Sequence, residues 1–289
     1  MKHTTGVWNP KEKHLSFAAG ADRIFPAIYK GILPDIKPKF KLNGLIELGS
    51  FKMNKAEQYF NYFDNLLIDS GAFSIASAYC KKHNIPLNQA FLTKYTSLDN
   101  YAKHWDEYIK VAQDYKDKYF GIVEIDLGGY QGKQEIRALI EQQGIIPIPV
   151  FHALVDPIEY FEQLVNEYDR VCISNIAFAS KSDRIKIMTY INHYLYKQNL
   201  NTFIHWLGVG NVDSLFYNLL GSCDATSWLM GGQYGKITMW LYDYLAVYSK
   251  KFIYLEGESY QYYEGRAMEF LDYSSLDFNE IYKLNNYEY

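Results

Sequence analysis

Leu66-Leu67-Ile68-Asp69-Ser70-Gly71-Ala72-Phe73-Ser74 is an apolar run that ends abruptly on an acid, a hydroxyl and a glycine. A short run that is apolar at successive positions predicts a strand buried on both faces. The acid at its end predicts a carboxylate presented where the strand stops. Other apolar runs along the chain end in the same manner, so this one segment indicates how the whole chain is organised.

These apolar runs alternate with stretches of helical periodicity from about residue 43 onward. We expect strands at 43–50, 65–73, 120–127, 145–152, 170–176, 202–209, 222–229 and 251–255. We expect helices at 55–63, 133–143, 182–198, 212–220 and 236–248, and a broken helical tract at 87–116. Buried strands separated by helices are typical of a parallel sheet, and about eight such units predict an α/β fold of the (β/α)8 TIM barrel type. A doubly wound open sheet is the alternative, although no GxGxxG follows the first strand.

The 289 residues suit one barrel domain with additional segments at both ends. We expect residues 1–42 to form an N-terminal capping segment, 43–255 the barrel and 256–289 a helical C-terminal segment. No linker of low complexity divides the chain, so a single domain spanning 1–289 is the simplest organisation.

Composition excludes several classes of protein. The net charge of −4 argues against a protein that binds nucleic acid by bulk basic charge, although a local basic groove is compatible with it. Cys80, Cys172 and Cys223 are scattered and form no CxxC pair, which disfavours a disulfide framework and a cysteine-rich zinc site. Without a signal-peptide pattern or a long apolar run, we expect a cytoplasmic protein with no membrane segment. Without metal-ligand spacing among its cysteines and histidines, we expect no metal, and we expect no cofactor.

Polar residues stand at the end of nearly every expected strand. They are Glu47, Asp69, Ser70, Glu124, Asp126, His152, Ser174, Asn175, Gly208 and Asp224, with His205 inside its strand. Each residue alone also fits a turn, a helix cap or a satisfied core position. Parallel barrels carry their chemistry at the carboxyl ends of the strands, so the joint occurrence predicts one active site at that rim.

Carboxylates around a pocket suit chemistry at a sugar carbon. One carboxylate attacks C1′ while a second manages the proton of the leaving group. No metal-ligand spacing and no GxSxG are present, which disfavours metal-dependent hydrolysis and a serine hydrolase. Phe73 offers a flat apolar face for a planar leaving group.

Five motifs, in order along the chain, resemble those of the tRNA-guanine transglycosylase superfamily. They are Asp69-Ser70-Gly71-Ala72-Phe73-Ser74, similar to DSGGFQ; Val150-Phe151-His152, at the place of VQGG; Ile173-Ser174-Asn175-Ile176-Ala177, similar to IGGLA; Leu207-Gly208-Val209-Gly210, similar to LMGVG; and Cys223-Asp224, similar to FDCVLPTR. The first and fourth are the most specific.

The resemblance implies a pentosyltransferase that exchanges guanine in a polynucleotide for a free 7-deazaguanine base. It implies Asp224 as the nucleophile that holds a covalent intermediate through C1′, and Asp69 as the acid/base. The implied substrate-binding residues are Ser70, Gly71, Phe73, Asp126, His152, Asn175, Leu207 and Gly208. Phe73 and Leu207 would sandwich a base that has been flipped out of its stack.

Departures from the family pattern indicate which branch of the superfamily the chain resembles. No cysteine follows Cys223, so the zinc site of the tRNA enzymes is missing, and Asn175 and His152 replace a glycine and a glutamine. The short zinc-less form resembles the 7-deazaguanine DNA transglycosylases and their phage relatives, which favours DNA over tRNA as the partner. The alternatives are an N-glycosidase that releases a base and a non-catalytic nucleic-acid-binding barrel, and the sequence leaves a homo-oligomer or accessory proteins open.

Overall fold

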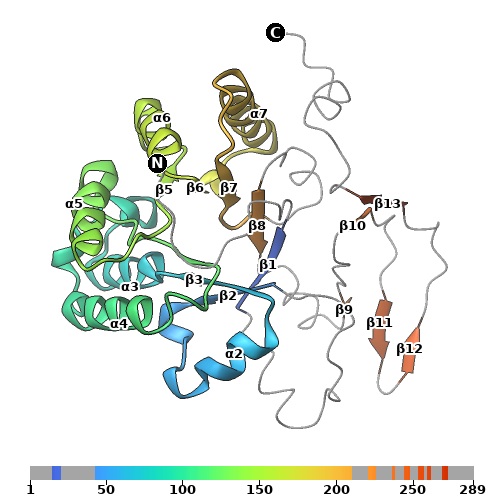
Figure 1. The fold of residues 1–289 in the computed structure, drawn as a ribbon, viewed down its shortest axis with the longest axis horizontal. Helices are drawn as coiled ribbons and strands as arrows, with labels where there is room; N and C mark the ends of the chain where they lie inside the picture. The colour runs from blue at the N-terminus through green and yellow to red at the C-terminus, as the bar shows by residue number, and fades with distance from the viewer. Residues whose placement is uncertain are drawn as a thin grey trace.

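The computed structural model describes residues 15–20, 43–209 and 221–225, together with five short strands further along the chain (Figure 1). The strands of the main sheet are β1 (Leu15–Ala19), β2 (Asn43–Glu47), β3 (Asn65–Asp69), β4 (Gly121–Ile122), β5 (Val150–His152), β6 (Arg170–Ser174), β7 (Phe203–Trp206) and β8 (Gly221–Ala225). The α-helices are α2 (Ala56–Tyr62), α3 (Ala72–His83), α4 (Tyr101–Asp114), α5 (Gly129–Gln142), α6 (Ile158–Glu167) and α7 (Lys181–Lys197).

Shorter elements complete the described part. The 3-10 turns are η2 (Leu48–Ser50), η3 (Met53–Lys55), η4 (Leu87–Leu92), η5 (Tyr95–Ser97) and η6 (Ile176–Phe178). The remaining strands are β9 (Lys236–Ile237), β10 (Tyr244–Val247), β11 (Ile253–Glu256), β12 (Ser259–Gln261) and β13 (Glu269–Asp272), which pair antiparallel outside the main sheet.

The main sheet is parallel throughout and has the strand order β4-β3-β2-β1-β8-β7-β6-β5. Consecutive strands are neighbours, and β1 lies beside β8. The ends of this order also meet, because Val123 and Ile148 form a parallel bridge between the continuations of β4 and β5. Ile148 N–H donates to the carbonyl of Ile122 at 2.8 Å, and Glu124 N–H donates to that of Ile148 at 3.0 Å.

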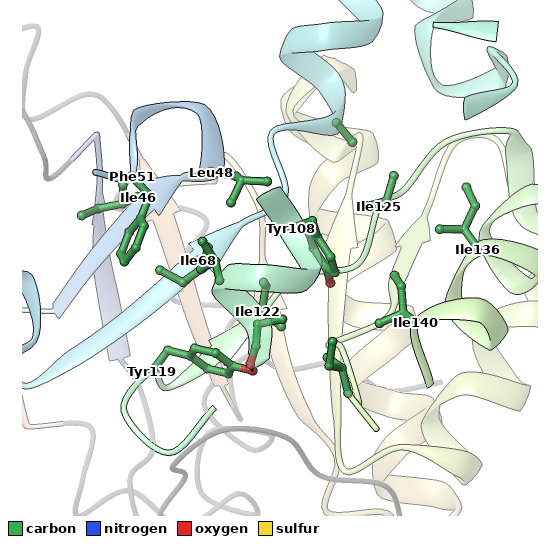
Figure 2. Close-up of a cluster of buried hydrophobic side chains, with 14 of the residues drawn as sticks. Ile46, Leu48, Phe51, Ile68, Tyr108, Tyr119, Ile122, Ile125, Ile136 and Ile140 are labelled. Atoms are coloured by element: carbon green, nitrogen blue, oxygen red, sulfur yellow. Dashed lines mark hydrogen bonds between the residues drawn. The ribbon is translucent and has the colours of Figure 1, made fainter. Parts of the chain in front are cut away.

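The helices cover one face of this sheet through two apolar clusters. The first joins β2, β3 and β4 to helices α2 to α5, and Figure 2 shows Ile46, Ile68 and Ile122 within it. The second joins β5 to β8 to helices α6 and α7 and contains Phe161 and Trp206. The amphipathic helices α4 and α6 supply the rows of buried residues that this packing requires.

The other face of the sheet has its own apolar cluster. Alternate residues of a strand point to opposite faces, and every second side chain contributes here. The cluster contains Phe17, Ala19, Leu45, Leu67, Phe120, Val123, Ile148, Val150, Cys172 and Phe203, with Leu207 packed against it. Residues near β4 and β5, at the two ends of the strand order, therefore share one core.

The expected limits of the sheet are wrong at both ends of the chain. The segment expected to cap the barrel contains β1, which pairs with both β2 and β8. The strand expected at 251–255 is β11, which pairs antiparallel with β9 and β12 and is not part of the main sheet. The sequence did not reveal β1, because its residues LSFAA include small residues and no β-branched residue, which is not typical of a strand.

Three other expectations also differ from the structure. Helix α3 begins at Ala72, inside the run expected to be strand to residue 73, because Gly71 adopts a left-handed conformation and ends the strand. The helix expected at 236–248 contains β9 and β10, and the helical segment 256–289 contains β12 and β13. The helix expected at 212–220 lies outside the described residues. No helix in the described part of the chain combines the length and apolarity needed to cross a bilayer.

Candidate active site

Asp69 is the last residue of β3 and faces Glu47, its register partner on β2. Gly71 follows with φ +72°, and a Cβ at that position would lie 3.0 Å from the Glu47 side chain. A glycine is therefore needed both for the backbone conformation and for the close approach of this carboxyl group. The pairing of β2 with β3 brings Glu47 and Asp69 together, and Gly71 leaves room for the Glu47 side chain.

Asp69 lies in an unusual electrostatic environment. Burial, followed by the charges of Asp126, Asp224 and Glu47, raises the pKa of Asp69 to about 8, while a hydrogen bond from Gly71 N–H opposes the rise. Four carboxyl groups from β2, β3, β8 and the segment after β4 therefore interact with one another. At neutral pH Asp69 holds a proton, which makes it a potential general acid.

Asp126 and His152 form a buried pair at the same edge. His152 Nε2 lies 2.8 Å from Asp126 Oδ2, and the two side chains are 0% and 9% exposed. His152 Nδ1 is buried and has no hydrogen-bond partner among the described residues. The short contact pairs Nε2 with the Asp126 carboxyl group and leaves Nδ1 as the ring atom without a partner among the described residues.

Asp224 lies on β8 and is held through one of its oxygens. Gly208 N–H donates to Asp224 Oδ1 at 2.8 Å, and His205 Nε2 lies 3.3 Å from the same atom. His205 Nδ1 is 2.7 Å from Ser222 Oγ, which sets the ring orientation. Asp224 Oδ2 has no such contact to the described residues.

Aromatic rings adjoin these polar groups. Phe73 stacks on Phe91 with ring centroids 5.1 Å apart, and the Phe91 ring is 4.3 Å from that of His152. Leu207 packs on the inner apolar cluster beside Gly208. Phe91, in the 3-10 turn η4, was not expected in the site because the sequence around it carries only a helical pattern.

Ser70 and Asn175, both expected to bind substrate, contribute to the backbone turns at the strand ends. Ser70 is fully buried, its Oγ accepts from Ala72 N–H at 3.4 Å, and its carbonyl lies 2.7 Å from His104 Nε2. Burial lowers the pKa of His104, which keeps this ring neutral as it holds the end of β3. Asn175 adopts φ +72° directly after β6, and its side chain makes no hydrogen bond to the described residues. Both residues shape the turns that bear the site.

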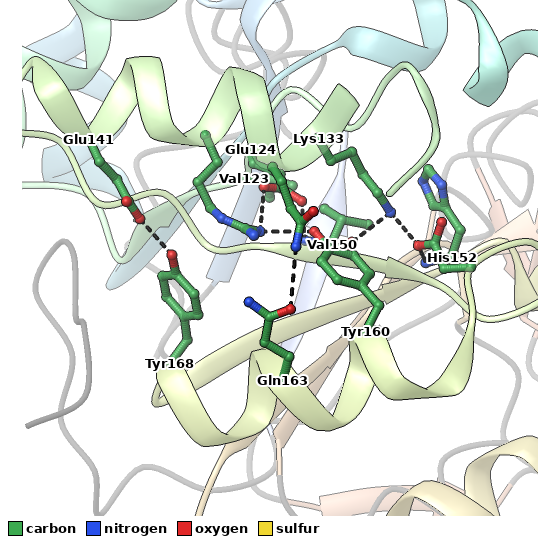
Figure 3. Close-up of polar contacts among 12 residues, drawn as sticks. Val123, Glu124, Lys133, Glu141, Val150, His152, Tyr160, Gln163 and Tyr168 are labelled. Carbon is green, nitrogen blue, oxygen red and sulfur yellow. Dashed lines mark hydrogen bonds and ion pairs between the residues drawn. The ribbon is translucent and has the colours of Figure 1, made fainter. Parts of the chain in front are cut away.

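Buried charges between the sheet and helices α5 and α6 form a different group (Figure 3). Arg137 Nη1 donates to Glu124 Oε2 at 3.0 Å and to Tyr160 Oη at 3.1 Å. The fully buried Lys133 binds Asp156 and donates to the carbonyl of Val150 at 2.8 Å. Glu124, expected at the rim, is paired with Arg137 in this group, and the charge of Asp126 still acts on it.

The structure therefore brings together Asp69, Asp126 and Asp224, with His152 on Asp126 and Gly208 on Asp224. Glu47 and His205, which the sequence pattern placed at the same rim without a specific role, join them. Within the residues that the structure describes, no group of three His, Cys, Asp or Glu side chains is placed to hold a metal ion. No protein-family model and no curated protein matches this chain.

Proposed function

We propose that this chain is a base-exchanging transglycosylase, which replaces guanine in a nucleic acid with a 7-deazaguanine base on a closed (β/α)8 barrel. The observation that carries the proposal is the convergence of Asp69, Asp126 and Asp224 at the carboxyl ends of parallel strands. The Val123–Ile148 bridge and the single inner cluster support closure of the sheet.

In this reaction Asp224 Oδ2 attacks C1′ of the target nucleoside. Gly208 N–H donates to Oδ1 and His205 Nε2 lies 3.3 Å from it, so the carboxyl group is oriented before the substrate arrives. The bond between C1′ and the base nitrogen breaks, its electron pair leaves with the base, and protonated Asp69 supplies the proton. The incoming base returns a proton to Asp69 and attacks C1′, which releases Asp224.

Recognition of the base falls to Asp126, His152 and the ring of Phe73. The carboxylate of Asp126 and the unpartnered Nδ1 of His152 supply hydrogen-bonding groups for the edge of a purine. A base inside a duplex cannot reach these groups, so the target nucleotide is flipped or lies in a single strand. DNA remains the preferred nucleic acid over tRNA because of the departures from the tRNA enzymes in the motifs.

An N-glycosidase is the second candidate, since water can also resolve a covalent Asp224 intermediate. Incubation with DNA that carries labelled guanine, together with a free 7-deazaguanine, separates the two. Exchange without abasic sites supports the transglycosylase, whereas abasic sites without exchange support the glycosidase. A non-catalytic barrel produces neither product.

Denaturing gels test the nucleophile directly. When the incoming base is withheld, the wild-type chain is expected to form a covalent adduct with a guanine-containing oligonucleotide. Asp224→Asn removes the nucleophile and abolishes the adduct, while Asp99→Asn, at an exposed acid on an ion pair with Lys82, leaves it intact. An adduct that persists in a folded Asp224→Asn variant contradicts the assignment.

A further inference from the structure

Phe178 is the most exposed large apolar side chain in the described part of the chain, with 66% of its surface accessible. It lies in η6, the turn that directly follows β6 and Asn175 at the carboxyl edge of the sheet. An isolated exposed apolar residue is ordinary, so its meaning depends on its backbone, its position and its neighbours.

The backbone that carries Phe178 is held firmly. Phe178 N–H donates to the carbonyl of Asn175 at 3.2 Å, and Ala179 N–H to that of Ile176 at 3.0 Å. Arg184 on α7 donates through Nη2 to the carbonyls of Ala177 at 3.3 Å and Ala179 at 3.4 Å. A ring that is exposed on a fixed turn loses little conformational entropy when a partner covers it.

The turn also adjoins the proposed nucleophile. A Cβ at Gly208 would lie 3.9 Å from Cβ of Ala177, the residue before Phe178. The N–H of the same Gly208 holds Asp224 Oδ1. Phe178 therefore directly follows a residue that lies against Gly208, the residue whose N–H binds Asp224.

The charge near Phe178 is locally positive. The first two turns of α7 carry Lys181, Arg184 and Lys186 against one acid, Asp183. That acid is bound to Ser180 Oγ at 2.7 Å and to Lys186 at 3.4 Å. In a chain of net charge −4, three cations beside one exposed ring complement a polynucleotide, whose phosphates need cations and whose bases need a stacking face.

We propose that Phe178 is a stacking platform for the nucleobase that neighbours the target nucleotide in a single-stranded segment. This inference rests on the proposed function, because it names how the substrate of that site is held. A ring on a braced turn stacks on any base, so the platform contributes affinity without selecting a sequence. The cations of α7 follow the adjoining phosphates.

Binding of a fluorescein-labelled single-stranded DNA 12-mer with one central guanine tests the platform by fluorescence anisotropy. Phe178→Ala is expected to weaken binding about tenfold, in the range found for loss of one base–aromatic stack, and Phe178→Trp to retain it. The matched control is Tyr196→Ala, which removes an aromatic ring of 48% exposure from the other end of α7 and leaves binding unchanged. The salt dependence of Phe178→Ala is expected to keep the wild-type slope, because no phosphate contact is lost.

Equal affinities for wild type and Phe178→Ala overturn the platform, as does an equal loss in Tyr196→Ala. A wild-type chain that binds no oligonucleotide also overturns it. The adduct assay separates this failure from that of the proposed function. If the wild-type chain forms adducts but Phe178→Ala binds with unchanged affinity, the transglycosylase is supported and the platform is refuted. If binding depends on Phe178 but neither adduct nor base exchange occurs, the binding surface is supported and the proposed chemistry is refuted.

Discussion

Two groups of buried charges in this molecule are built in opposite ways. Between the sheet and helices α5 and α6, each acid has a cation, Glu124 with Arg137 and Asp156 with Lys133 (Figure 3). At the carboxyl edge of the sheet, Asp69 interacts with three further acids, and the partners found for the cluster are two imidazoles and backbone N–H groups. Each buried acid near α5 and α6 is therefore neutralised by a cation, whereas the acids at the sheet edge gather negative charge.

The difference indicates which group serves stability and which serves chemistry. A compensated pair is destabilising to break, because removal of one partner leaves a buried charge alone. Burial raises the pKa of Glu124 to about 7, although the charges of Arg137 and Lys133 oppose the rise. Burial and three neighbouring acids raise the pKa of Asp69 to about 8, and no cation among the described residues opposes that rise. Such perturbed groups concentrate at functional sites.

The largest effect on stability is expected for Arg137→Met. It removes the cation that is hydrogen-bonded to Glu124 and leaves only the charge of Lys133, among the described cations, to act on this buried carboxyl group, so the free energy of unfolding is expected to fall by about 3 kcal/mol in urea denaturation. Adding Glu124→Gln removes the orphaned charge while keeping an acceptor for Val150 N–H, so the double variant recovers part of the loss. A double variant no more stable than Arg137→Met would show that Glu124 is not the source of the loss.

Asp69→Asn is expected to raise the free energy of unfolding, where Arg137→Met lowers it. The pKa of Asp69 is about 8 in the folded chain, against an ordinary 3.8 when unfolded, so wild-type stability falls as pH rises from about 4 to about 8. The variant lacks this loss and is expected to exceed wild type by more than about 2 kcal/mol at pH 8, since the pKa difference spans several units and each unit corresponds to about 1.4 kcal/mol. Urea titrations at pH 4 and pH 8 measure the difference, and a gap that does not widen with pH contradicts the raised pKa.

The pH dependence of the reaction rate tests Asp69 independently of stability. If Asp69 acts in its protonated form, the rate of base exchange declines as pH rises through about 8. Initial rates from pH 6 to pH 9.5 measure this limb. Asp99→Asn is expected to follow the wild-type profile, and a wild-type rate that still rises above pH 8 would exclude Asp69 as the acid.

A smaller effect is expected for Gly71→Ala. A non-glycine residue at φ +72° costs about 1–2 kcal/mol, and the new Cβ meets the Glu47 side chain at 3.0 Å. Thermal unfolding is expected to show the loss, with Gly49→Ala as the control because a methyl group added at Gly49 would meet no other atom within 4 Å. Equal melting temperatures would show that the turn relaxes freely.

The smallest effect is expected at an ion pair on the surface. Lys82 and Asp99 are 2.6 Å apart with more than half of each side chain exposed, and solvent screens their attraction. Lys82→Ala is expected to leave urea denaturation unchanged within error. A loss comparable to that of Arg137→Met would mean that burial does not distinguish the two kinds of pair.

The sequence pattern predicted those elements that are set by residues close together in the chain. The apolar run before Asp69 is a strand, and the strand-end positions of Asp126, His152 and Asp224 place all of them at one edge of a parallel sheet. Helix α3 was missed because its start depends on the conformation of Gly71, which overrides the strand-like run into Phe73. Phe91 was missed because it reaches His152 through tertiary packing alone.

The sequence by itself determined the alternation of buried strands and helices and the acids at the strand ends, since burial periodicity and breaker residues act over a few positions. Only the tertiary structure decided that β1 inserts between β2 and β8, because strand pairing depends on partners more than 20 residues away in the chain. It also decided which acids stay unpaired. Glu124 and Asp69 are both strand-end carboxyls, and only the packing of α5 provides one of them with an arginine.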